Sequence, residues 1–214
     1  MDEDISSINA STRNEKIKNF FINNTKRIII FLSAIIIIIV GYFLYDEIKK
    51  RNIIKIADQF NNSKLDFISG NKVNIEKNMI EIIEAKDKTY SPLALYFLID
   101  NNLISSKEKI NNFFDIIIND IKLNKEIKNL IIYKKAIYNS SFESESNLLN
   151  ILNPVINSNS VWKSHGLYLL GEYFLSKNEK QKSKQFFEKI MEMENSNPKI
   201  KLEAQKRIQR DFSE

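Results

Sequence analysis

Histidine and cysteine, the side chains best suited to acid–base, metal and nucleophilic chemistry near neutral pH, are nearly missing from this chain of 214 residues. The single histidine is His165, and one histidine cannot supply the paired ligands of a typical zinc site. The chain has no cysteine, which excludes disulfides, thiolate metal sites and cysteine nucleophiles together. We therefore expect no metal, no cofactor and no catalytic residue.

Carboxylates are the remaining candidates for catalysis. Glu81 with Glu84, or Glu143 with Glu145, could in principle provide an acid and a base. In a chain of which 28% is charged, such spacing is expected on any exposed helix, and the 4 glycines form no phosphate loop, dinucleotide fingerprint or nucleophile elbow. We expect the chain not to be an enzyme; an enzyme with an unrecognised carboxylate site is the alternative from another class.

Aromatic side chains are the candidates for binding, because tyrosine and tryptophan are enriched at the energetic centres of protein interfaces. Five of them could line a groove that receives another protein: Tyr133, Tyr138, Trp162, Tyr168 and Tyr173. Each is also consistent with packing between helices, and the sequence alone does not separate the two interpretations. We expect protein partners and no small-molecule substrate.

The charge pattern argues against nucleic acid as a partner. The formal net charge is +5, and lysines alternate with glutamates, as between Lys177 and Glu188. Interleaved charges are typical of a solvated helix face, whereas a nucleic-acid surface needs basic residues gathered on one face. We expect no nucleic-acid binding.

The strongest pattern in the chain is the uncharged run IIIFLSAIIIIIVGYFLY, residues 28–45. As a helix it is about 27 Å long, close to the roughly 30 Å hydrocarbon core of a bilayer. We predict a transmembrane helix whose span includes Ile28, Phe31, Ile35, Ile39, Phe43 and Tyr45. The alternative is a buried core helix, which would need a large surrounding core because the run is apolar on every face.

The run is predicted to be a permanent anchor. Signal-peptide apolar regions usually have 7 to 15 residues and end in a small-x-small cleavage site, and neither feature is present here. Basic residues on the two sides nearly balance, with Lys26 and Arg27 before the span and Lys49, Lys50 and Arg51 after it. The charge distribution slightly favours a cytoplasmic N-terminus. In a bacterium this orientation would place the following domain in the periplasm.

The segments on either side complete the expected organisation. Residues 1–27 form a cytoplasmic tail, of which residues 1–14 are polar, without periodicity, and expected to be disordered. From Glu15 to Arg27, Ile17, Phe20 and Phe21 share a helical face, and basic residues accompany them: Lys16, Lys18, Lys26 and Arg27. This segment is either a helix at the lipid headgroups or a frayed extension of the anchor helix.

Residues 46–214 have helical periodicity throughout, so we expect an all-α domain. The expected helices cover about 46–67, 72–85, 91–102, 106–120, 125–139, a sixth that ends before Pro154, 161–176, 179–194 and a ninth from Pro198. The first of these could continue the anchor without a break. Ser91 is expected to cap the third, with Pro92 in its first turn.

A hairpin pattern recurs within this domain. Tyr96-Phe97-Leu98, then Asn101 and residues 113–117, has a second copy in Tyr173-Phe174-Leu175, Asn178 and residues 186–190. Recurrence of a helical hairpin favours a solenoid over a compact bundle.

The clearest copy resembles the tetratricopeptide repeat. It reads Leu167-x-x-Leu170-Gly171-x-x-Phe174, followed by Ser183 and Phe187. The resemblance implies that the small residues Gly171 and Ser183 let two helices cross closely. The copy departs from the repeat at Asn178, where glycine is preferred at the turn, and at Pro198, which comes a few residues late.

With the anchor, the whole layout resembles a bacterial membrane-anchored tetratricopeptide-like family that includes the ancillary subunit of the SecYEG translocon. That resemblance implies a periplasmic domain that binds inner-membrane and periplasmic proteins, translocon or chaperone components among them, and no catalytic residues. The expected function is an interaction scaffold accessory to Sec protein translocation or periplasmic chaperone work. A scaffold for cell-division or envelope-assembly machinery is the alternative.

Overall fold

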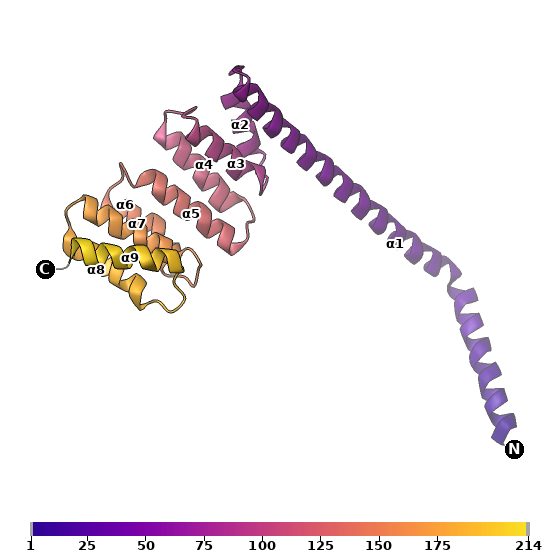
Figure 1. The fold of residues 1–214 in the computed structure, drawn as a ribbon. Coiled ribbons are helices and arrows are strands. Elements are labelled where there is room, and N and C mark those ends of the chain that lie inside the picture. Colours follow the sequence, from indigo (N-terminus) through magenta and orange to yellow (C-terminus); the bar gives the residue numbers. More distant parts are fainter. Residues whose placement is uncertain (1, 213–214) are drawn as a thin grey trace. The chain divides into compact units, whose positions relative to one another are not determined.

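The computed structural model describes residues 2–212, and every regular element among them is an α-helix (Figure 1). The helices are α1 (Asp2–Ile68), α2 (Ile75–Glu84), α3 (Tyr90–Asp100), α4 (Lys107–Asp120), α5 (Lys125–Asn139), α6 (Glu145–Ile156), α7 (Lys163–Ser176), α8 (Lys180–Glu192) and α9 (Pro198–Asp211). The expectation of an all-α chain is confirmed for these residues.

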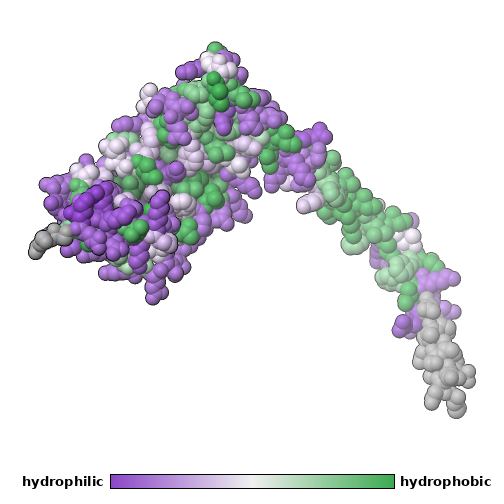
Figure 2. Space-filling view, viewed as in Figure 1, coloured by the Kyte–Doolittle hydropathy of each residue, from purple (hydrophilic) through white to green (hydrophobic). Residues whose placement is uncertain are grey.

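Helix α1 holds the apolar run. The chain divides into two units, Met1–Lys55 and Ile56–Glu214, and the run lies in the first. Its side chains from Ile29 to Tyr45 are exposed, with Ile30 at 70% and Ile37 at 71%. Figure 2 shows this part of α1 as a hydrophobic surface. Helix α1 therefore contains a segment long and apolar enough to cross a membrane, and none of that segment is buried within the protein.

The start of α1 differs from the expectation of a disordered tail over residues 1–14. Met1 lies outside the described residues, and residues 2–14 are helical in the structure. No glycine or proline occurs before Gly41 to stop a helix, so the helix extends through the polar residues. At the other end α1 passes through Asp46 without a break and ends at Ile68.

The second unit is built from successive antiparallel hairpins. Each helix from α2 to α9 packs on the next one in the chain, and α2 also packs on α4, α5 on α7, and α7 on α9 (Figure 1). Side chains of α3 and α5 meet around one cavity, so α3, α5, α7 and α9 form one layer. Helices α2, α4, α6 and α8 alternate with them along the chain, and α2 packs on α4.

Two groups of buried side chains stabilise these helices. The first extends from the end of α1 to α5, where Phe60 of α1 lies 6.5 Å from Phe97 between ring centroids. Its most buried members are Met79, Ile82, Ile83, Leu95, Leu98, Phe114, Ile117 and Ile131. The second lies between α6 and α9 and includes Leu148, Leu152, Leu170, Phe174, Phe187 and Ile190. Full burial of each such side chain contributes about 1.5–3 kcal/mol.

Helices α7 and α8 approach each other at Gly171. A Cβ atom at Gly171 would lie 2.5 Å from Cε1 of Phe187, and Phe187 is fully buried. The Ser183 hydroxyl donates a hydrogen bond of 2.8 Å to the Gly171 carbonyl. The two small residues thus stand where the helices come closest, and Phe187 fills the space beside them.

Polar side chains define where several helices begin. In α4, α5, α6 and α9 the residue before the helix accepts a hydrogen bond from a main-chain N–H of the first turn, and these residues are Ser106, Asn124, Ser144 and Asn197. Each such cap contributes about 1 kcal/mol to the stability of its helix.

The expectation that the sixth helix ends before Pro154 is wrong, because α6 continues to Ile156. Proline normally disrupts a helix by removing one N–H and crowding the preceding turn. Here the Pro154 ring is exposed, while the next residue, Val155, is fully buried. The N–H of Asn157 also donates to the Asn153 carbonyl at 3.2 Å. Packing of Val155 keeps the last turn helical.

The expectation that Ser91 caps the third helix is also wrong. Helix α3 begins at Tyr90 and Thr89 precedes it, so Ser91 lies inside the first turn with Pro92. Ser91 is fully buried, and its hydroxyl donates a 2.8 Å hydrogen bond to the Ile82 carbonyl of α2. The serine joins two helices instead of starting one.

Candidate partner-binding surface

Two of the aromatic residues singled out in the sequence, Tyr133 and Trp162, stack against each other. Tyr133 belongs to α5 and Trp162 immediately precedes α7; their ring centroids are 5.9 Å apart and their planes differ by 22°. His165 contacts both rings, at 5.8 Å from Tyr133 and 5.0 Å from Trp162. All three side chains are half-buried, so the cluster is partly accessible from outside.

A carboxylate holds the loop that carries Trp162. Glu126 of α5 accepts hydrogen bonds from the Ser160 hydroxyl at 2.7 Å and from the Val161 N–H at 3.2 Å. The Val161 side chain, next to Trp162, is 66% exposed. An exposed apolar residue is thus fixed beside the aromatic cluster.

Burial sets the protonation of the cluster. It lowers the pKa of His165, and the nearby Val161 carbonyl partly opposes this shift. The Nδ1 atom of His165 is buried without a hydrogen-bond partner of ordinary geometry. Burial also raises the pKa of Tyr133. At neutral pH the cluster is therefore an uncharged, largely apolar surface, which suits contact with an apolar group.

A small cavity lies on the other side of α5. It has a volume of about 220 Å³ and is lined by Tyr96, Ile99, Asp100, Phe114, Lys134, Ile137 and Tyr138. Tyr138, the third residue singled out in the sequence, forms part of its wall. The Tyr96 hydroxyl is buried and has no hydrogen-bond partner, and burial raises the pKa of Tyr96 to about 12. The Lys134 ammonium lies 5.7 Å from the centre of the Tyr96 ring.

The cavity and the aromatic cluster lie in one layer. Tyr133 and Lys134 are adjacent on α5, one contacting α7 residues and the other reaching the α3 ring. We call this region the α3–α5–α7 surface: Tyr96, Tyr133, Lys134, Ile137, Tyr138, Val161 and Trp162. It combines aromatic rings, exposed aliphatic side chains and one ammonium group.

Tyr168 and Tyr173 of α7, the other two aromatic residues singled out in the sequence, are not part of the α3–α5–α7 surface. The Tyr173 side chain is only 6% exposed, and its hydroxyl donates to the Glu143 carbonyl at 3.1 Å. Tyr168 is half-buried and packs on Phe187 at 5.5 Å between ring centroids. Burial, together with the negative charge of Glu172, raises the pKa of Tyr168 to about 12. Both tyrosines have packing roles between helices, and Tyr173 has almost no surface to offer a partner.

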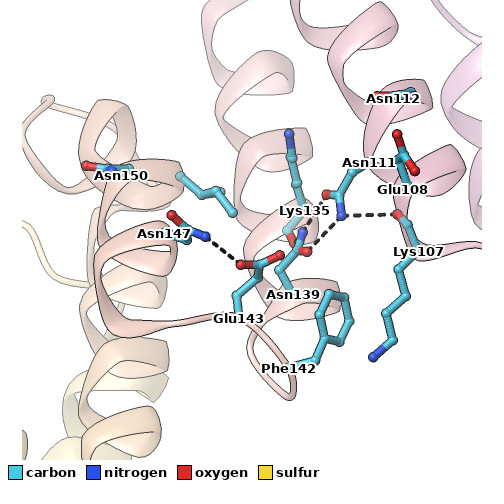
Figure 3. A pocket seen from close by; sticks show the side chains of 11 residues that line it. Lys107, Glu108, Asn111, Asn112, Lys135, Asn139, Phe142, Glu143, Asn147 and Asn150 are labelled. Atoms are coloured by element: carbon cyan, nitrogen blue, oxygen red, sulfur yellow. Dashed lines mark hydrogen bonds between the residues drawn. The ribbon is translucent and has the colours of Figure 1, made fainter.

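A second hollow, lined mostly by polar groups, opens between α4, α5 and α6 (Figure 3). Its volume is about 520 Å³. The amides of Asn111 and Asn139 bond each other reciprocally at 2.9 and 2.8 Å, and Asn147 donates to Glu143 at 2.7 Å. Its lysines and carboxylates mix both signs of charge, so the hollow favours neither an anion nor a cation.

Glu81 and Glu84 line one hollow of about 650 Å³ beside α2, and three of the four carboxylates considered for catalysis accept hydrogen bonds from different partners. Glu81 accepts from Gln59 at 3.0 Å, Glu143 from Asn147, and Glu145 from Lys182 at 3.0 Å. Over the described part of the chain, no three histidine, aspartate or glutamate side chains gather in a group able to hold a metal ion.

The sequence reasoning missed Tyr96 and Lys134. The internal repeat carried a signal for one of them, because Tyr96 and Tyr173 begin the same three-residue motif in the two copies. Their surroundings differ. The Tyr173 hydroxyl donates a hydrogen bond to the Glu143 carbonyl, whereas Tyr96 lines a cavity and its hydroxyl has no hydrogen-bond partner. Lys134 carried no such signal, because lysines are frequent on exposed helix faces throughout the chain.

The α3–α5–α7 surface brings together aromatic side chains and a cavity of about 220 Å³, whose lining carries both a cation, Lys134, and a carboxylate, Asp100. Comparison of the chain with models of protein families, with curated proteins and with solved structures finds no match in any of the three. The functional interpretation consequently depends on the residues themselves and on their geometry.

Proposed function

We propose that this chain is a single-pass membrane protein whose tetratricopeptide-like helical domain lies in the bacterial periplasm and serves as an interaction scaffold. In this proposal residues 28–45 span the inner membrane with the N-terminus in the cytoplasm. The domain acts by contact alone, as an accessory to Sec protein translocation or to periplasmic chaperones. The anchor keeps it beside membrane-bound partners and so raises its effective concentration for them.

The observation that carries the proposal is the uncovered apolar stretch of α1. Side chains from Ile29 to Tyr45 are exposed and meet no other part of the protein. Leaving this much apolar surface in water is unfavourable, and its length matches a bilayer, so lipid is the environment that covers it.

Two features of the domain support a tetratricopeptide-like scaffold. Consecutive hairpins pack in chain order, as they do in solenoids. The close contact of Gly171 with Phe187, and the hydrogen bond from Ser183 to the Gly171 carbonyl, fit the roles that the repeat gives to these positions. The α3–α5–α7 surface supplies the aromatic side chains that a partner would contact.

Site-specific photo-crosslinking in cells tests the partner. We expect a photoreactive residue replacing Val161 to crosslink translocon subunits, because Val161 is 66% exposed beside Trp162. The matched control carries the same residue at Gln185, which is exposed on α8 outside the α3–α5–α7 surface, and should not crosslink them. Crosslinks from Val161 to cell-division proteins without translocon subunits would reject this function in favour of a division scaffold.

A reporter that is active only after export, fused to the C-terminus, tests the orientation. We expect activity. A reporter active on the cytoplasmic side instead would overturn the periplasmic location and the partners that follow from it.

A further inference from the structure

The helical segment that precedes the span carries apolar side chains that nothing in the protein covers. Ile17, Phe20 and Phe21 are 48%, 60% and 55% exposed. At about 100° per residue, Ile17, Phe21 and Ile28 fall within an arc of about 40°, and Phe20 lies about 60° to one side. Ile22 lies off this face and is 60% exposed. The segment thus has an apolar face that is continuous in the sequence with the span.

Basic residues surround this apolar face. Between residues 13 and 27 the chain has five basic residues and one acidic residue, Glu15. Lys16 and Arg27 fall near one edge of the face, and Lys18 falls near the other. Long basic side chains in such positions place their charged ends at the level of lipid headgroups while their methylene groups follow the apolar surface.

A straight continuation of the span would not bury these side chains. Phe20 lies about 12 Å along the helix axis from Ile28, whereas each headgroup layer is only about 5–8 Å deep. Ile17 and Phe20 would then stand in water beyond the headgroups. A helix lying in the plane of the membrane surface would instead place them at the boundary of headgroups and acyl chains.

Two side chains between this segment and the span, Asn24 and Thr25, form hydrogen bonds that favour a bend in the helix. The Asn24 amide donates to the Phe20 carbonyl at 2.9 Å. The Thr25 hydroxyl is within hydrogen-bond distance of two carbonyls, Phe21 at 2.7 Å and Ile22 at 3.0 Å. If the main-chain hydrogen bonds here open, the Phe20 carbonyl keeps the Asn24 amide, and the single Thr25 hydroxyl hydrogen serves the Phe21 or the Ile22 carbonyl. Side chains bonded in this way are a recognised cause of helix bending.

We propose that residues 15–23 lie on the cytoplasmic membrane surface, with a bend at Asn24–Thr25, and that their lysines bind anionic phospholipid headgroups. The inference requires the proposed membrane span and is independent of the proposed partners. Anionic lipid is the occupant because the surplus charge of the segment is positive and the bilayer is already the neighbour of Ile28.

Spin labels on the full chain in lipid nanodiscs test the arrangement. The chain has no native cysteine, so Ile17→Cys, Asn19→Cys and Ile37→Cys each give a single labelling site. In membranes containing phosphatidylglycerol, we expect the label at 17 to collide with oxygen and the label at 19, on the opposite face, to collide with a nickel chelate. A label at 17 as accessible to nickel as the label at 19 would overturn the proposal.

A pair of double variants tests whether the segment prefers anionic lipid. Each basic residue near an anionic surface strengthens binding about fivefold, so Lys16→Gln with Lys18→Gln should lower the ratio of membrane-bound to free segment about 25-fold. The matched control, Lys49→Gln with Lys50→Gln beyond the span, should leave that ratio unchanged. The anionic-lipid assignment would be overturned if the ratio of bound to free segment did not change in the Lys16→Gln, Lys18→Gln variant. It would also be overturned if the unchanged chain gave the same ratio in pure phosphatidylcholine as in membranes containing phosphatidylglycerol.

The label at Ile37 separates this inference from the proposed anchor. Oxygen contact at 37 together with nickel contact at 17 would overturn only the surface helix. Nickel contact at 37 would show that the span itself is absent, and both proposals would fail.

Discussion

Single side chains decide how closely the helices of the domain approach. Gly171 leaves space for the Phe187 ring, and Phe187 is held in place by Tyr168 on one side and Phe212 on another. A ring packed in this way cannot rotate to admit an added methyl group. The contact therefore gives a direct test of the packing between α7 and α8.

We predict that Gly171→Ala destabilises the domain. The added Cβ would meet Phe187 at 2.5 Å, and overpacking of this kind costs about 1–3 kcal/mol, offset by up to about 1 kcal/mol of helix propensity. The control is Gly166→Ala, whose Cβ would lie 3.0 Å from Cγ2 of Ile156, 3.4 Å from Cδ2 of Leu152 and 3.7 Å from Cγ1 of Val155, which are all looser contacts. Urea unfolding of the full chain in detergent should place Gly171→Ala about 1–3 kcal/mol below Gly166→Ala. Equal stability of the two variants would contradict the close contact.

Tyr96 gives the second test at this scale. Its neutral hydroxyl is favoured by burial, so the folded-state pKa of about 12 lies above the ordinary value of 10.0. The stability that this difference provides is complete below about pH 10 and is lost as the pH rises through about 12. Tyr96→Phe removes the titrating group, and we predict a smaller loss of stability than in the unchanged chain when unfolding is followed from pH 9 to 11.5.

At neutral pH, Tyr96→Phe should be as stable as the unchanged chain or more stable, because it removes a buried hydroxyl that has no partner. A variant whose stability falls as steeply with pH as that of the unchanged chain would show that the Tyr96 hydroxyl is in water.

At the scale of elements, α9 is held to α7 by charge as well as by apolar contact. Arg207 of α9 pairs with Glu172 of α7, and both side chains are half-buried, at 26% and 30% exposure. The apolar part of the contact includes Ala204 of α9, which is fully buried in a cluster with Leu167 of α7. Because the pair joins two helices and is shielded from water, it should contribute more than an exposed pair within one helix.

We predict that Arg207→Met lowers the free energy of unfolding by about 1–2 kcal/mol, because it removes the arginine that pairs with the half-buried Glu172 carboxylate across the two helices. Lys206→Met is the matched control: Lys206 pairs with Glu203 of the same helix at 2.9 Å and is 59% exposed, so its loss should cost under about 0.5 kcal/mol. Thermal unfolding monitored by circular dichroism would compare them, and similar losses would contradict a special role for the pair between helices.

The sequence predicts elements better than it predicts contacts between them. Helix α5 has the expected bounds, since Asn124 provides a local cap and apolar residues recur at helical spacing after it. Pro154 and Ser91 misled the prediction, because their outcome depends on the burial of Val155 and on the Ile82 carbonyl of another helix. Likewise, the aromatic residues were found from their type, but which of them meet was decided by packing, which stacks Tyr133 on Trp162 and buries Tyr173.

At the scale of the whole molecule, α1 belongs to two environments. Its apolar run is covered by nothing in the protein, whereas its last turns, from Phe60 to Phe67, join the core of the domain. One helix therefore serves as the predicted anchor and as the first structural element of the domain. Composition predicts the anchor, whereas the packing of Phe60 against Tyr90 and Phe97 is visible only in the fold.

The packing of each helix on its neighbours in the chain has a mechanical consequence. Removing α9 uncovers α7 and α8 and leaves the hairpins nearer to α1 in contact with their own neighbours. A pulling force or a processive protease that engages the C-terminus would therefore peel the domain hairpin by hairpin, and the part that shares α1 with the apolar run would be the last to come apart.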